Sequence, residues 1–107
     1  MDLTKDSEKL LCLLYKSYLE KVNSGLSKST ANAFGDSHKI HDTLCPDWLF
    51  EDVDETCRQL SRAGFLKCFW ADGIASETSL SDSGIVYMEN RFKNSLLSVA
   101  DFLSNFL

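Results

Sequence analysis

With 107 residues, an apolar fraction of 44% and a charged fraction of 25%, the chain has the size and composition of one ordinary soluble globular domain. No apolar run approaches the ~20 residues that a membrane-spanning helix needs, and the first residues, Met1-Asp2-Leu3, lack the basic and apolar segments of a secretory signal. We therefore expect a single cytoplasmic domain over residues 1–107 that has no membrane partner.

The net charge of −5 is unevenly distributed along the chain. Residues 1–45 contain six lysines and six acids, whereas residues 46–107 contain five basic residues against ten acids. The whole deficit therefore lies in the second half of the chain. Because nucleic acid repels an acidic protein over long distances, this distribution weighs against a nucleic-acid partner for that half.

The first half of the chain is predicted to form helices joined by a loop. Over residues 10–22 apolar side chains cover most of the helical circumference, which is typical of a central helix packed on several sides. Residues 26–37 are small and polar, so we expect a long loop there, with one helical turn around residues 30–34. A short helix is expected over about residues 36–44, and Pro46 stops it.

Residues 49–63 carry the most regular helical pattern in the chain. Val53, Cys57 and Leu60 recur at i, i+4 and i+7, and Leu49 lies one turn earlier. This spacing places the four side chains on one apolar stripe of a helix. The stripe is expected to face the core.

A β-hairpin is predicted directly after this helix. Residues 65–70 are mostly apolar and aromatic, and the Asp72-Gly73 pair is a strong signal for a tight hairpin turn. Residues 74–80 are then the returning strand. Trp70 ends the first strand beside the turn and is the side chain that we expect to act as an exposed anchor.

The last segment, residues 82–107, is predicted to be one long helix. Its apolar residues recur every three or four positions, as in a coiled-coil seam: Ile85, Met88, Phe92, Leu96, Val99, Leu103 and Phe106. Two arrangements fit this pattern. The helix either joins two copies of the chain or folds back against the first helix. We expect a homodimer, because large exposed apolar faces usually mark interfaces, with Phe92, Leu96, Val99, Leu103 and Phe106 at the interface.

The order helix, short helix, helix, strand, turn, strand, helix resembles a winged helix-turn-helix domain. The segment L-S-R-A-G-F-L-K-C at 60–68 resembles the end of the third helix of that fold running into the first wing strand. The segment T-S-L-S-D-S-G-I-V-Y-M-E-N at 78–90 resembles the strand and helix start that close many bacterial winged-helix regulators. The nearest resemblance is to small phage-associated (YjcQ-like) proteins and, more loosely, to multiple-antibiotic-resistance-type regulators.

This resemblance implies an α+β, mostly helical fold, with a two- or three-stranded wing hairpin and a long C-terminal helix. It also implies a transcriptional regulator of a bacterial or phage system that binds double-stranded DNA. The helix at 49–63 would enter the major groove, and residues 71–76 would form the wing. The side chains that this implies as nucleic-acid contacts are Arg58, Arg62, Lys67, Lys39 and Trp70.

A second hypothesis uses the same fold without DNA. The start of the helix at 49–63 holds Glu51, Asp52, Asp54 and Glu55 and has no basic residue before Arg58, whereas phosphate contacts normally need lysine or arginine. The alternative is an acidic winged-helix module that docks on a basic protein surface. Both hypotheses remain open on the sequence alone.

No motif in the sequence predicts an enzyme, a cofactor or a metal site. His38 and His41, with Cys45 four residues on, could lie along one helix face, but three residues do not complete a structural zinc site. No G-x-S-x-G or glycine-rich phosphate loop is present. The four cysteines form no C-x-x-C pair and are expected to be buried, reduced thiols.

Overall fold

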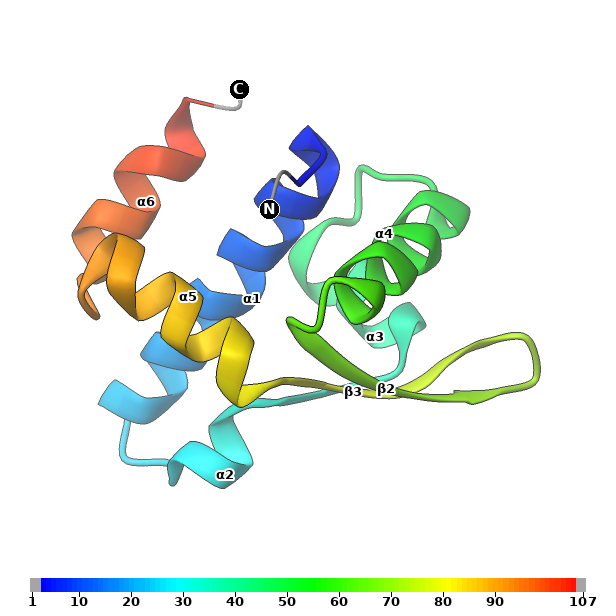
Figure 1. The fold of residues 1–107 in the computed structure, drawn as a ribbon, viewed down its shortest axis with the longest axis horizontal. Coiled ribbons are helices and arrows are strands. Elements are labelled where there is room, and N and C mark those ends of the chain that lie inside the picture. Colours follow the sequence, from blue (N-terminus) through cyan, green and yellow to red (C-terminus); the bar gives the residue numbers. More distant parts are fainter. Residues whose placement is uncertain (1–2, 106–107) are drawn as a thin grey trace.

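Helices pack around one three-stranded antiparallel sheet in the computed structural model, which describes residues 3–105 (Figure 1). The elements in chain order are α1 (Lys5–Asn23), α2 (Lys28–Ala31), β1 (Ala33–Gly35), α3 (Ser37–Leu44), α4 (Phe50–Arg62), β2 (Leu66–Ala71), β3 (Ile74–Leu80), α5 (Asp82–Phe92) and α6 (Leu96–Ser104). The α+β, mostly helical class expected from the sequence is confirmed. Within the described range, every helix is too short or too polar to cross a lipid bilayer.

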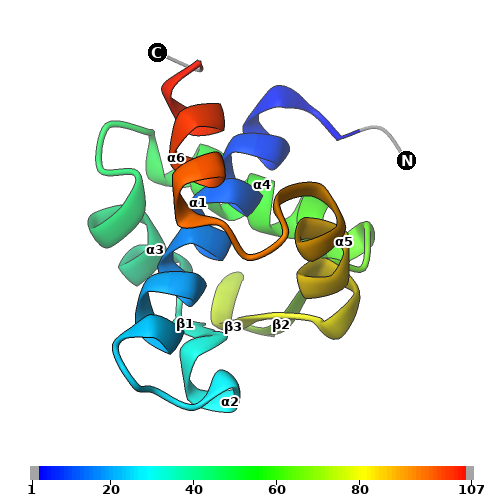
Figure 2. The ribbon, with the colours of Figure 1, turned by 90° about the vertical axis from the view of Figure 1, so that its left-hand side faces the viewer.

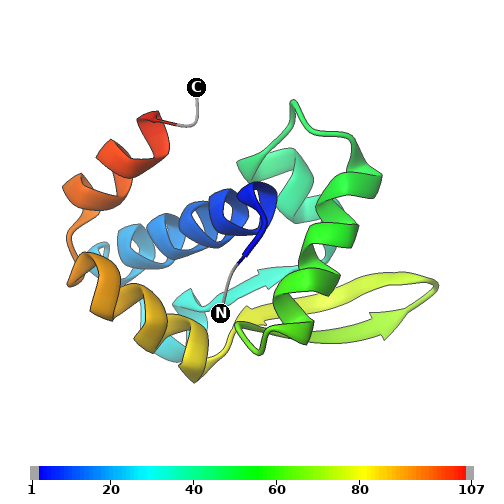
Figure 3. The ribbon, with the colours of Figure 1, turned by 45° about the horizontal axis from the view of Figure 1, so that its top comes forward.

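Helix α1 is the centre of the domain. Its side chains Leu10, Leu11, Leu14 and Tyr15 are almost completely buried, because α5 and α6 lie along one side of it and α3 and α4 along the other (Figures 1 and 3). The hydroxyl of Thr4 caps the helix by accepting a hydrogen bond from the Ser7 amide. The apolar pattern at 10–22 therefore predicted the central helix correctly.

The sheet has the strand order β1-β3-β2, so the chain returns from the hairpin to pair its last strand with its first. Ala33 on β1 and Lys67 on β2 both lie opposite Ser79 on β3. Helices α1, α4 and α6 lie on one side of the sheet (Figure 2). We call that side the inner face and the opposite side the outer face.

Strand β1 was not predicted, because three residues are too few to show an alternating pattern. The ammonium group of Lys21 donates a hydrogen bond at 3.2 Å to the backbone carbonyl of Ala33 in this strand. The predicted helical turn near residues 30–34 lies slightly earlier, in α2. The hairpin of β2 and β3 follows the predicted boundaries to within a residue.

The apolar stripe predicted for α4 is confirmed in its central part and wrong at its first member. Val53, Cys57 and Leu60 are fully buried. Leu49 is 72% exposed, because the helix begins at Phe50 and Leu49 is the extended residue before it. The helical spacing therefore does not extend back to Leu49.

The prediction of one long C-terminal helix is wrong. Lys93 and Asn94 have positive φ angles of 52° and 61°, and these left-handed residues reverse the chain between α5 and α6. The buried Tyr15 hydroxyl donates a hydrogen bond to Asn94 Oδ1 at 2.9 Å, which holds the corner against α1. Helix α6 consequently folds back along α1 (Figure 3).

Candidate interaction surface on α4 and the hairpin

The outward side of α4 is acidic in its first two turns. Because Val53, Cys57 and Leu60 turn towards the core, the helical period leaves Glu51, Asp52 and Glu55 in solvent. The partial positive charge at a helix N-terminus stabilises acids at these positions. This end of α4 therefore presents carboxylates to any partner.

Asp54 belongs to the same run of acids but is buried, with only 8% of its surface exposed. Its Oδ1 accepts hydrogen bonds from the Ser37 hydroxyl at 2.9 Å and from the Ala75 amide at 3.0 Å. One carboxylate thereby joins α3, α4 and β3. No residue pattern signals this role, since Asp54 lies in the sequence among other acids, Asp52 and Glu55, that are exposed.

Arg58, a predicted nucleic-acid contact, is directed back into its own domain. Its Nη2 donates to the Gly73 carbonyl at 2.7 Å and to Asp54 Oδ2 at 3.3 Å. Its guanidinium carbon lies 4.3 Å from the centre of the Trp70 ring, which is a cation–π contact. The structure thus brings two predicted site residues, Arg58 and Trp70, together near the turn of the hairpin. Their contact stabilises the hairpin against α4.

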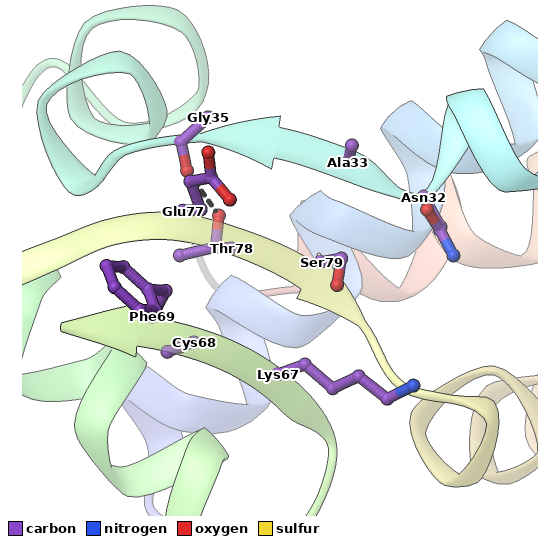
Figure 4. Close-up of a pocket in the computed structure, with 9 residues that line it drawn as sticks. All are labelled: Asn32, Ala33, Gly35, Lys67, Cys68, Phe69, Glu77, Thr78 and Ser79. Atoms are coloured by element: carbon purple, nitrogen blue, oxygen red, sulfur yellow. Dashed lines mark hydrogen bonds between the residues drawn. The ribbon is translucent and has the colours of Figure 1, made fainter.

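The other three predicted nucleic-acid contacts do not gather beside this pair. Arg62 is exposed and pairs with Glu55 at 3.4 Å. Lys39 is exposed at the start of α3, with its methylene groups close to Gly35. Lys67 lies on the outer face of the sheet, where it lines a shallow depression (Figure 4). The sheet therefore separates Lys67 from Arg58 and α4.

Both histidines take part in contacts at the junction of α3 and α4. The two ring nitrogens of His41 lie 2.8 Å from the Trp48 carbonyl oxygen and 2.8 Å from Asp42 Oδ1. The hydrogen bond to Asp42, and then the one to Trp48, raise the pKa of His41. His38 stacks on Phe50 with ring centres 3.9 Å apart. Among residues 3–105 no three His, Cys, Asp or Glu side chains are placed to bind a metal together.

The cysteines are free thiols, as expected. Burial raises the pKa of Cys12 and of Cys57 to about 12, and that of Cys45 to about 11. Burial also raises the pKa of Cys68, which is only half-buried. Because the thiolate is the nucleophile, these side chains are held in their unreactive form at neutral pH.

The residues predicted to join two copies through the C-terminal segment have several different environments. Phe92 and Val99 are buried inside the chain, where α6 meets α1 and α5. Leu96 and Leu103 are half-buried against the same core, and Phe106 lies outside the described residues. Leu97 is the large apolar side chain of α6 that is most exposed, at 72%. The arrangement in which the segment folds back on the first helix is the one observed.

Comparison with known proteins gives no match to a family model, to a characterised protein or to a solved structure. The resemblance to winged-helix proteins, including the small phage-associated ones, therefore stays a prediction. The element order and the sheet are compatible with it.

Proposed function

We propose that the chain is a winged-helix domain that binds a basic protein partner through the exposed side of α4, and that it does not bind DNA itself. The fold part of the proposal is supported by the element order and by the strand order β1-β3-β2, in which a short first strand precedes two helices and a hairpin. In such a domain α4 is the reading helix and the β2–β3 turn is the wing. The choice of partner follows from charge.

The observation that carries the proposal is the position of the Arg58 guanidinium. A reading helix needs basic side chains directed at phosphates. Arg58 instead bonds to the Gly73 carbonyl and to Asp54, and Arg62 pairs with Glu55. With Arg58 retained by the domain, the exposed surface of the first two turns of α4 is the acidic set of Glu51, Asp52 and Glu55.

A basic partner would use this surface mainly for orientation and speed of association. Single exposed ion pairs contribute only about 0.2–1 kcal/mol each, but a patch of one sign steers a partner of opposite sign and repels like-charged ones. Trp70 is 38% exposed beside the patch and supplies an aromatic side chain for a central contact. The module therefore combines acidic steering with one aromatic anchor.

The test compares two fluorescent probes by anisotropy at low salt: a lysine-rich peptide and a random-sequence DNA duplex. The expected result is salt-sensitive binding of the peptide and no binding of the duplex. Glu51→Lys should then weaken peptide binding by about two- to fivefold, as expected for one surface ion pair.

The matched control is Asp101→Lys, which makes the same charge change at an exposed position on α6. It should change peptide binding less than Glu51→Lys does, because it leaves the α4 patch intact. Equal effects of the two variants would show that only net charge matters and would contradict a site on α4. Binding of the wild-type protein to the duplex, with affinity falling steeply as salt rises, would contradict the choice of partner.

DNA binding is the second candidate function, and the placement of α4 favours it. The helix lies between α3 and the hairpin, as a reading helix would, and Arg62, Lys39 and Trp70 are exposed around it. In this case the protein would be a transcriptional regulator of a bacterial or phage system. The duplex arm of the same experiment decides between the two candidates.

A further inference from the structure

The outer face of the sheet carries a shallow depression of about 610 Å³ (Figure 4). Its floor is made of small side chains, with Ala33 and Ser79 opposite each other on β1 and β3. Larger side chains stand around this floor. Lys67 extends towards the end of the sheet where Asn32 lies, whereas Phe69 and Glu77 lie together at the other end (Figure 4).

The large side chains of this face have no partners among the described residues. Phe69 is 65% exposed and has no ring contact there. Lys67 and Glu77 are exposed, and within residues 3–105 neither forms an ion pair. On α4, by contrast, the arginines are paired inside the chain. The outer face therefore offers one positive charge, one negative charge and one aromatic ring for binding.

We propose that this outer face binds a second copy of the chain in a two-fold symmetric dimer. A two-fold interface is made of the same patch on both subunits, so the patch must contain complementary features within itself. This face contains both signs of charge at opposite ends. It also holds both a protruding ring, Phe69, and a floor of small side chains that can receive one.

The two-fold axis that brings these complementary features together lies in the plane of the interface and runs perpendicular to the strands. It turns one copy end for end, so that the Lys67 end of one sheet lies over the Phe69 and Glu77 end of the other. Lys67 of each copy then reaches Glu77 of its partner copy, which gives two equivalent ion pairs. Because this rotation keeps β2 over β2, Phe69 of each copy lies over the methylene groups of Lys67 of its partner copy, at the border of the small-residue floor near Ser79. The same contacts are thus made twice.

The size of the face sets the expected strength of the dimer. Three strands spaced by about 4.8 Å make a face only roughly 15 Å wide, so it buries less than the roughly 800 Å² per partner of a stable interface. We therefore expect a weak dimer, with a dissociation constant on the order of 10–100 µM. This interface lies on the opposite side of the sheet from α4 and does not depend on the partner proposed for that helix.

A charge exchange across the interface tests this arrangement. The monomer–dimer equilibrium of the wild type, Lys67→Glu, Glu77→Lys and the double variant is measured by sedimentation up to about 500 µM protein, well above the expected dissociation constant. Each single variant places like charges opposite each other twice and should weaken the dimer about tenfold or more. The double variant restores opposite charges and should dimerise within about twofold of the wild type.

Three results would overturn the proposal: a monomeric wild type at the highest concentration, a dimer unaffected by the single variants, and a double variant that stays monomeric. The exposed Lys93→Glu on the far corner of the domain is the matched control and should leave the equilibrium unchanged. Phe69→Ser should also abolish the dimer. All the changes are at exposed positions, so circular dichroism should show the same fold for every variant.

Discussion

The two faces of the three-stranded sheet differ in what their side chains contact. On the inner face, Leu66 and Leu80 are buried, and Trp70 contacts Arg58 of α4. On the outer face, Lys67 and Glu77 have no ion-pair partner among the described residues. Neighbouring residues of one strand thus face either α4 and the core or the opposite, solvent-exposed side, because successive side chains of a strand point to opposite faces.

This difference shows that charge alone does not identify a binding residue. Arg58 and Lys67 are both basic, and both were predicted to contact nucleic acid. Arg58 stabilises the hairpin through the Gly73 carbonyl, whereas Lys67 points into solvent beside the depression. Substitutions on the inner face should therefore lower the free energy of unfolding, whereas substitutions on the outer face should leave it almost unchanged.

The largest effect is expected for Asp54→Ala. Removing this carboxylate leaves the Ser37 hydroxyl and the Ala75 amide without their acceptor in a buried place and also releases Arg58. The free energy of unfolding should fall by about 2–4 kcal/mol, measured by urea titration. On the outer face, Glu77→Ala should change it by less than about 0.5 kcal/mol.

Asp54→Asn separates the loss of the hydrogen-bond acceptor from the loss of the negative charge. The amide oxygen can still accept from Ser37 and Ala75, but the charge that pairs with Arg58 is lost. It should therefore destabilise the protein less than Asp54→Ala does. Equal losses for Asp54→Ala and Glu77→Ala would mean that the two faces do not differ in the way described.

A smaller effect is expected from two neighbours on β2. Trp70→Ala removes the ring under Arg58 and should lower the free energy of unfolding by about 1 kcal/mol. Phe69→Ala, one residue earlier and 65% exposed, should change it by less than about 0.5 kcal/mol. The measurement should use dilute protein, about 5 µM, so that dimer formation does not contribute to stability. A larger loss at Phe69 would reverse the assignment of the two faces.

The smallest effect concerns pH. Both groups that His41 bonds to, the Trp48 carbonyl and the Asp42 carboxylate, are acceptors, so the two hydrogen bonds together require the protonated imidazolium ring. The pKa of His41 is accordingly raised in the folded protein. The stability that protonated His41 contributes to the folded protein is fully present below the unfolded pKa of about 6.5. It is lost as pH rises through the folded pKa.

The urea midpoint of the wild type should therefore fall more between about pH 6 and pH 8 than that of His41→Gln. Subtracting the two curves removes the contributions that the wild type and the variant share. The urea midpoint of the wild type minus that of His41→Gln should fall as pH rises. A rise in this quantity would contradict the two-donor arrangement of His41.

The sequence predicted the parts of the fold that rest on a repeated pattern. The central helix, the stripe of Val53, Cys57 and Leu60, and the hairpin at Asp72-Gly73 all follow from spacing or turn chemistry, and the structure contains them. It did not predict β1, whose three residues show no period. It also missed the corner at Lys93 and Asn94, since no glycine or proline marks the left-handed residues there.

The candidate sites were less predictable, because they depend on which charges meet in space. Asp54 and Glu55 are adjacent in the sequence, yet one joins three elements and the other is solvated. Likewise, the neighbours of Lys67 on the outer face depend on the register of the hairpin. In this register Lys67 lies opposite Ser79, and Phe69 lies opposite Glu77. Neither the hydrogen bonds of Asp54 nor the face on which Lys67 lies can be predicted from the residue pattern before the helices and strands are placed in space.

The direct test of the account is the behaviour of the Arg58 guanidinium in solution, observed by NMR of the arginine side-chain N–H groups in the isolated protein. Held by the Gly73 carbonyl and Asp54, the Nη protons of Arg58 should be resolved and protected from exchange with water, whereas those of the exposed Arg62 should be averaged and fast. If the Arg58 signals were as averaged and as fast as those of Arg62, the guanidinium would be available to a partner. The central claim, that α4 presents an acidic surface because its arginine is retained by the domain, would then be contradicted.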